Sequence, residues 1–156
     1  MHGISLFSRL VAAALICAGL LAGCQTLGQA GLIQSTVTAQ LTPEAASSIA
    51  GDMVDRLAEQ AGPGNTTIRF TPDGSAFGQA LAASLQSWGY AVVTDQKTDQ
   101  ENILDLAYTV DEFEGTVLVR LSTPRFDLTR MYKPGAEGAS VVSPLSVRQH
   151  GSAGTA

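Results

Sequence analysis

The sequence predicts an α+β domain over residues 41–132, in which two helices pack on a mostly antiparallel or mixed sheet of about four to five strands. Three observations support this fold class. Two segments repeat apolar residues at helical spacing, later segments alternate apolar and polar residues, and the elements follow the order helix, strand, helix, strand, strand, strand. So many consecutive strands do not fit a doubly wound parallel sheet.

The first predicted helix begins after Thr42, which is placed as the N-cap. Pro43 suits the first helical position, and Glu44 lies near the positive end of the helix dipole. Apolar residues then recur at spacings of three and four, at Ala46, Ile49, Ala50, Met53, Val54 and Leu57. The segment Gly62-Pro63-Gly64 ends this helix.

A strand over Thr66–Thr71 and a turn separate this helix from a second one over Ser75–Trp88, with Ser75 as its cap. Gly89 can close the helix in a left-handed conformation. The next segment, Tyr90–Thr94, reads as a buried strand. Because Trp88 and Tyr90 lie at a helix-to-strand junction, we expect both to pack in the core rather than form a ligand-stacking platform.

Two paired antiparallel strands follow the polar loop 95–102. Leu104, Leu106, Tyr108 and Val110 alternate with polar or small residues, and Val117, Val119 and Leu121 repeat the pattern after Glu114-Gly115. The segment Phe126–Tyr132 predicts a further edge strand. Residues 133–156 are rich in Gly, Ser, Ala and Pro and predict a flexible tail, although Val141-Val142 and Pro144-Leu145 can pair or dock.

The N-terminus has the pattern of an export signal over residues 1–23. Arg9 supplies a positive charge, and the apolar run Leu10–Leu21 has about a dozen residues, whereas a spanning helix needs roughly 20. The run closes with Leu21-Ala22-Gly23-Cys24, which resembles the processing site of a bacterial lipoprotein precursor. We therefore expect cleavage before Cys24 and a covalent lipid on its thiol. An ordinary cleaved signal with a chance cysteine is the alternative.

The segment 24–40 has two open interpretations. Its Gln, Thr, Gly, Ser and Ala content, without a sustained period, is typical of a flexible tether. Alternatively, its scattered apolar side chains dock into a partner protein at the membrane and become ordered on binding. These candidate docking residues are Leu27, Leu32, Ile33 and Val37.

Composition excludes several function classes. The net charge is −5, and removal of residues 1–23 takes away only the charge of Arg9, so the exported body is more acidic still. An acidic chain without a basic patch is a poor candidate for direct nucleic-acid binding. Cys17 lies inside the signal and Cys24 is expected to be acylated, so no cysteine pair remains for a disulfide.

The sequence contains no catalytic, metal-binding or cofactor-binding pattern. The one histidine after the signal, His150, lies in the predicted tail, which excludes histidine triads and multi-histidine metal sites. Asp111, Glu112 and Glu114 lack the spacing of a calcium loop and predict a solvated hairpin end. We therefore expect no enzyme, no small-molecule substrate and no cofactor besides the covalent lipid.

Three arginines, Arg120, Arg125 and Arg130, flank the last predicted strands. They can meet an acidic partner in a ring assembly, or they can simply be solvated charges that protect strand edges from aggregation. The sequence favours neither interpretation over the other.

Four segments resemble the TrbH family of conjugal transfer lipoproteins: Leu41–Ala46, Gly51–Val54, Trp88–Thr98 and Arg120–Pro124. The likeness covers most of the chain from Cys24 to about Val147. It implies a non-enzymatic subunit of a type IV secretion apparatus for plasmid transfer. The implied partners are outer-membrane ring subunits in a multi-copy assembly, and the implied fold is similar to the peripheral domain of secretin rings.

The same resemblance implies attachment to the outer membrane, facing the periplasm. An aspartate directly after the cysteine resembles a mark for retention in the inner membrane. This chain has Gln25 at that position, and the absence of the aspartate favours the outer membrane. The rival interpretation is a stand-alone periplasmic lipoprotein that binds a ligand or the cell wall. A cleft lined by Trp88, Tyr90 and Tyr108 would support that rival.

Overall fold

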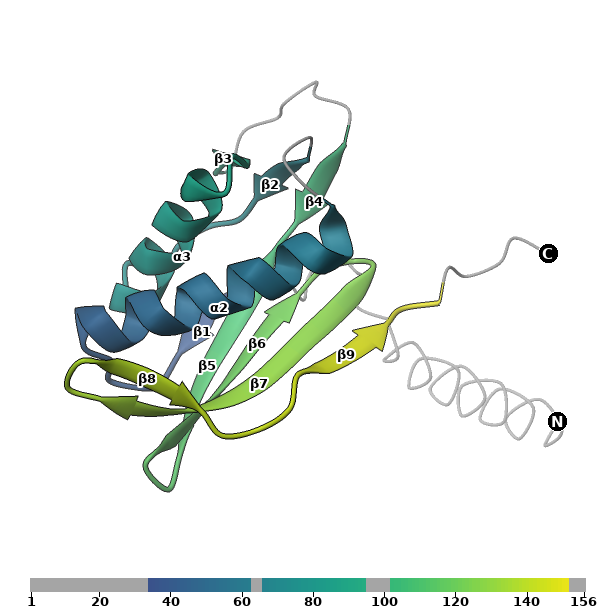
Figure 1. Ribbon diagram of the computed structural model, residues 1–156. Coiled ribbons are helices and arrows are strands. Elements are labelled where there is room, and N and C mark those ends of the chain that lie inside the picture. Colours follow the sequence, from purple (N-terminus) through teal and green to yellow (C-terminus); the bar gives the residue numbers. More distant parts are fainter. Residues whose placement is uncertain (1–33, 63–65, 95–101, 152–156) are drawn as a thin grey trace, which may run out of the picture. The chain divides into compact units, whose positions relative to one another are not determined.

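The computed structural model describes residues 34–62, 66–94 and 102–151, all within one compact unit, Ile33–Ala156 (Figure 1). Its two helices and its strands confirm the α+β class. In chain order the elements are β1 (Thr36–Val37), α2 (Pro43–Ala61), β2 (Thr67–Arg69), α3 (Ala76–Ser87), β3 (Ala91–Val93), β4 (Ile103–Asp105), β5 (Ala107–Phe113), β6 (Thr116–Ser122), β7 (Phe126–Gly135), β8 (Gly138–Val141) and β9 (Ser146–Gln149).

The described strands form two sheets rather than one. The larger sheet has the order β1-β5-β6-β7-β8, and β9 also pairs with β7, while the smaller sheet is the parallel set β3-β2-β4. Figure 1 shows α2 lying across the larger sheet, with α3 beside it. The strands therefore outnumber the four to five that the sequence predicts, because the predicted tether and tail both contribute strands.

The caps of both helices are confirmed. The Thr42 hydroxyl accepts a hydrogen bond from the Ala45 amide at 3.2 Å, and the amide of Gly62 donates to the Ala58 carbonyl at 3.0 Å. The Ser75 hydroxyl likewise accepts from the Gly78 amide at 3.0 Å. These bonds satisfy backbone groups that every helix end leaves unpaired.

One alternating segment contributes a strand to each of the two sheets. The alternating run that predicts a single strand is divided at Leu106, with β4 in the smaller sheet and β5 in the larger. The Leu106 amide donates to the Arg69 carbonyl at 2.9 Å, and the predicted hairpin partners are confirmed, with Tyr108 opposite Leu121. The four apolar side chains of the run are all buried, so both sheets share one core.

The prediction for Trp88 is wrong. Its side chain is 45% exposed, whereas Tyr90 is buried. Trp88 is the C-cap of α3, one residue before Gly89 turns the chain at φ +91°. At this position the indole lies against α2, where its Nε1 donates to Asp55. The predicted buried strand Tyr90–Thr94 is the edge strand β3, whose Ala91 is exposed.

The predicted flexible tail, residues 133–156, is wrong over most of its length. Strand β7 runs on to Gly135, and both β8 and β9 pair with it in antiparallel register. As a result β7 is an interior strand, not the predicted edge strand. All four β9 residues are exposed, so the strand is ordered by its backbone pairing with β7. Its sequence therefore lacks the alternation of apolar and polar residues that predicts a strand.

The described chain begins and ends at the same end of the larger sheet. The Ser35 hydroxyl accepts from the Tyr108 amide at 3.4 Å, at the first residues of β5. There Ala107 pairs with Ser122, Ser122 with Asp127, and Asp127 with Arg148 of β9. The hairpins β5–β6 and β7–β8 lie at the other end of the strands (Figure 1).

We predict that Gly78→Ala destabilises the domain by about 1–3 kcal/mol, because an added Cβ would collide with Tyr108 Oη and Asp73 Oδ1 in a packed core. The matched control is Gly51→Ala within α2, where nothing lies within 4 Å of the new Cβ. Removing a helical glycine there is expected to stabilise by about 0.5–1 kcal/mol. Urea denaturation of both variants measures the difference, and equal stabilities would contradict the packing.

Candidate functional site

The expected lipid attachment site lies outside the described residues. This holds for Cys24, for Leu21, Ala22 and Gly23 before it, and for three candidate docking residues, Leu27, Leu32 and Ile33. Their roles stay predictions.

Val37, the fourth candidate docking residue, belongs to the fold of this chain. It lies in β1, paired in parallel with Val110 of β5, and packs half-buried against the core. The next amide, of Thr38, donates to the Val110 carbonyl at 2.9 Å. The end of the predicted tether therefore adds a strand to the sheet, and Val37 is not free to dock into a partner in the way the sequence suggests.

The three arginines have different environments. Arg120 and Arg125 are exposed, but Arg130 lies half-buried on the face of β7 that meets α2. Its Nη1 is 2.9 Å from Asp52 Oδ2, so its charge is used inside the domain. Of the arginines proposed to meet an acidic partner, Arg120 and Arg125 are left at the surface.

Asp52 joins α2 to β7. Besides the Arg130 guanidinium, it accepts a hydrogen bond of 2.5 Å from the Tyr132 hydroxyl. Burial, followed by the bond to Asp52, raises the pKa of Tyr132 above its ordinary value, so the hydroxyl stays protonated and acts as a donor. This group positions a helix on a sheet and leaves no free acid or base.

Asp73 joins the turn before α3 to β5. Its Oδ1 accepts from the Tyr108 hydroxyl at 2.9 Å and from the Ser75 hydroxyl at 2.6 Å. Burial raises the pKa of Tyr108 to about 12. Burial also works to raise the pKa of Asp73, but the hydrogen bonds from Ser75 and Tyr108 outweigh it and the net shift is downward. Asp73 is therefore held as a structural acceptor.

Asp127 holds the last strand in place. It is 7% exposed, and its Oδ2 lies 2.7 Å from Arg148 Nη2 of β9 and 3.2 Å from His150 Nε2. Burial tends to raise the pKa of this carboxyl, yet the bonds with His150 and Arg148 hold it below the ordinary value. The lone histidine after the predicted signal thus pairs with a structural carboxylate.

The acidic hairpin end behaves as the sequence predicts, since Asp111, Glu112 and Glu114 are all exposed. Within the described ranges, no three His, Cys, Asp or Glu side chains gather closely enough to hold a metal ion.

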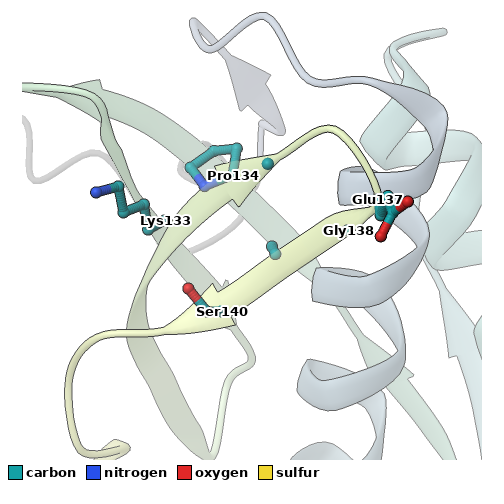
Figure 2. A pocket seen from close by; sticks show the side chains of 7 residues that line it. Lys133, Pro134, Glu137, Gly138 and Ser140 are labelled. Atoms are coloured by element: carbon teal, nitrogen blue, oxygen red, sulfur yellow. The ribbon is translucent and has the colours of Figure 1, made fainter.

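The surface of the described part of the chain has hollows at several places. One of about 430 Å³ lies on the β7–β8 hairpin, lined by Lys133, Pro134, Gly135, Glu137, Gly138, Ala139 and Ser140. Figure 2 shows the Lys133 and Glu137 side chains on opposite sides of the hairpin, so they do not converge on a common centre. Another, of about 280 Å³, lies between the segment after β1 and the start of α3, and is lined by Val37, Ala39, Gln40, Leu41, Ser75, Ala76 and Phe77.

A third hollow, also about 430 Å³, is lined by Asp55, Arg56, Ala58, Glu59 and Trp88. Sequence reasoning missed it, because it depends on how α3 ends against α2. The cleft of Trp88, Tyr90 and Tyr108 that would support a stand-alone binding protein is not formed. Tyr108 is fully buried, and the Tyr90 hydroxyl is turned to the Gly62 carbonyl at 2.7 Å.

These observations define the class of the protein: a small α+β domain in which the carboxylates of Asp52, Asp73 and Asp127 join one element of the fold to another. The sequence matches the family described as "Conjugal transfer protein TrbH" over residues 27–151, and the chain belongs to this family.

A relative from Sinorhizobium fredii (strain NBRC 101917 / NGR234), "Probable conjugal transfer protein TrbH", is 47% identical over 135 residues. The alignment covers 83% of this chain and 90% of the relative. A search of solved structures gives no match, so the expected likeness to the secretin peripheral domain stays a prediction.

We predict that acid releases β9 before the rest of the domain. Because the pKa of Asp127 is lowered in the fold, the stability it contributes is present above its unfolded pKa and is lost as pH falls through the folded value. The hydrogen-exchange protection factors of the Arg148 and His150 amides, which pair with Asp127 in β7 and with Arg125 just before it, should therefore fall at acidic pH once the intrinsic pH dependence of exchange is removed. In Asp127→Asn these protection factors should be low already at neutral pH, and protection equal to that of the wild type would contradict the assignment.

Proposed function

We propose that this protein is a non-enzymatic, lipid-anchored subunit of the apparatus that mates bacterial cells for plasmid transfer, placed at the outer membrane. The observation that carries the proposal is the combination of Leu21-Ala22-Gly23-Cys24 with a TrbH-family domain directly after it. Family membership supports a role in conjugal transfer. The processing sequence supports the place at which that role is performed.

The anchor is expected to be lipid. None of the helices in the described ranges is both long enough and apolar enough to span a membrane. One acyl chain binds a bilayer only marginally, whereas the two or three chains of a bacterial lipoprotein hold it almost permanently. Acylation of Cys24 is thus sufficient to keep the domain at the membrane without a spanning segment.

The tether sets how far the domain can move. The described fold begins at Gln34, so about ten residues connect it to Cys24, and fully extended they reach roughly 35 Å. The domain is therefore confined to the layer next to the bilayer, where ring subunits of a secretion apparatus would meet it. Repetition of one contact around a multi-copy ring makes a weak interface strong.

Docking to those ring subunits is assigned to the residues before the fold. Since Val37 packs against the core of its own domain, the apolar side chains left for a partner are Leu27, Leu32 and Ile33. The rival function, a stand-alone ligand-binding lipoprotein, loses its main support because two of the three aromatic residues of its cleft are buried.

Lipidation is tested with Cys24→Ser. We expect loss of palmitate labelling, release from the outer-membrane fraction and a fall in plasmid transfer of more than an order of magnitude, because the domain is no longer held at the membrane. Cys17→Ser is the matched control, since it removes the other cysteine of the chain and leaves the processing site intact. Mass spectrometry of the wild-type protein that finds an unmodified amino terminus would refute the proposal.

Docking by the tether is tested with the triple substitution Leu27→Ser, Leu32→Ser and Ile33→Ser. These changes keep the length of the tether and Cys24 but remove its apolar side chains, so co-purification with outer-membrane ring subunits should fall while lipidation continues. The control replaces the polar residues Thr26, Gln29 and Gln34 with alanine. Undiminished co-purification of the triple variant would show that docking resides elsewhere.

A further inference from the structure

The hollow at the end of α3 contains an exposed aromatic side chain held in a fixed place. Trp88 Nε1 donates a hydrogen bond of 2.8 Å to Asp55 Oδ1 of α2, while 45% of the residue remains accessible. This bond satisfies the polar atom of the indole and leaves a large apolar ring surface in contact with solvent. A ring fixed in this way loses little conformational entropy when a ligand stacks on it.

The walls of the hollow carry more negative than positive charge. Asp55, Ala58 and Glu59 lie three and four residues apart and so share one side of α2. The positive charge among the lining residues, Arg56, is bound to Glu59 at 2.5 Å and lies 3.9 Å from Asp52. The Glu59 side chain is still 54% exposed, so its second oxygen is able to accept a further hydrogen bond.

An aromatic ring beside carboxylates suits a cation. Tryptophan is the best side chain for cation–π attraction, and a guanidinium can stack on an indole while it donates to a carboxylate at the ring edge. An anion would be repelled by Asp55 and Glu59, and a purely apolar group would leave their charges unused. The hollow, of about 430 Å³, has room for one long side chain.

We propose that this hollow binds an arginine side chain presented by a partner protein. The partner is identified by charge complementarity: it carries an exposed arginine on a surface that meets the junction of α2 and α3. This function goes beyond membrane attachment, because it gives the folded domain a contact of its own, independent of Cys24 and of the tether.

The test uses the fact that Trp88 is the single tryptophan of the chain. Its emission is recorded in the acylated protein in detergent during titration with the peptide acetyl-Gly-Arg-Gly-amide. The control peptide has citrulline in place of arginine, which keeps the shape and removes the charge. We expect a saturable change with the arginine peptide, weaker by roughly ten-fold with citrulline and reduced by salt. Equal responses to both peptides would overturn the proposal.

Two variants with matched charge changes locate the site. Glu59→Gln should weaken the arginine peptide several-fold, whereas Glu44→Gln, which removes an exposed carboxylate from the first turn of the same helix, should not. Trp88→Ala is followed by anisotropy of a labelled peptide, with circular dichroism to verify the fold. Unchanged binding in Trp88→Ala, or equal losses in the two glutamate variants, would contradict the assignment.

The exposed arginines of this chain, Arg120 and Arg125, provide a rival occupant, namely a second copy. If Trp88 emission depends on protein concentration and this dependence disappears in Arg125→Gln or Arg120→Gln, the partner assignment is wrong.

Plasmid transfer in Glu59→Gln cells separates this proposal from the proposed function. Lipidation should continue there, so a loss of transfer supports the hollow, whereas normal transfer overturns its role and leaves the lipid anchor unaffected.

Discussion

The fold depends on Tyr108, which joins three layers at one point. Its ring makes edge-on contacts with Phe70, after β2, and Phe77 of α3, at centroid distances of 6.2 and 5.3 Å. Its hydroxyl donates to Asp73 and accepts from the Asp73 amide at 3.0 Å, which fixes the turn that starts α3. The smaller sheet, the larger sheet and the second helix are thus held by one fully buried side chain whose polar atom is satisfied.

Local signals explain what the sequence could predict. The helix caps at Thr42 and Ser75 bond to amides only a few positions further along the chain. The hairpin of β5 and β6 has its own alternating pattern and a turn in which Glu114 and Gly115 have positive φ. These features need no knowledge of distant parts of the chain. The α+β class followed from them directly.

The elements that the sequence could not predict depend on distant partners. Strand β1 pairs with β5 across more than seventy residues, and β9 is held by Asp127 rather than by apolar side chains. The same applies to the hollow, because Asp55 and Trp88 meet only when α2 and α3 pack together. A sequence pattern records the composition of each surface but not which surfaces come together.

Three carboxylates link elements of the fold: Asp52 joins α2 to β7, Asp73 joins the turn before α3 to β5, and Asp127 joins β7 to β9. The surfaces proposed for contact with other proteins, namely the segment before the fold and the hollow where α3 ends, involve none of these three carboxylates. Membership of the TrbH family supports a role of the chain in conjugal transfer.

The placement of β1 determines how the domain resists force. Because β1 runs parallel to β5, a pull along the strand axis at the first residue of β1 would load its pairing with β5 from one end. The bonds from Thr38 to Val110 and the pairing of Val37 are then strained together in shear, and not opened one after another as in peeling. A short strand paired in this way resists such a pull as a mechanical clamp.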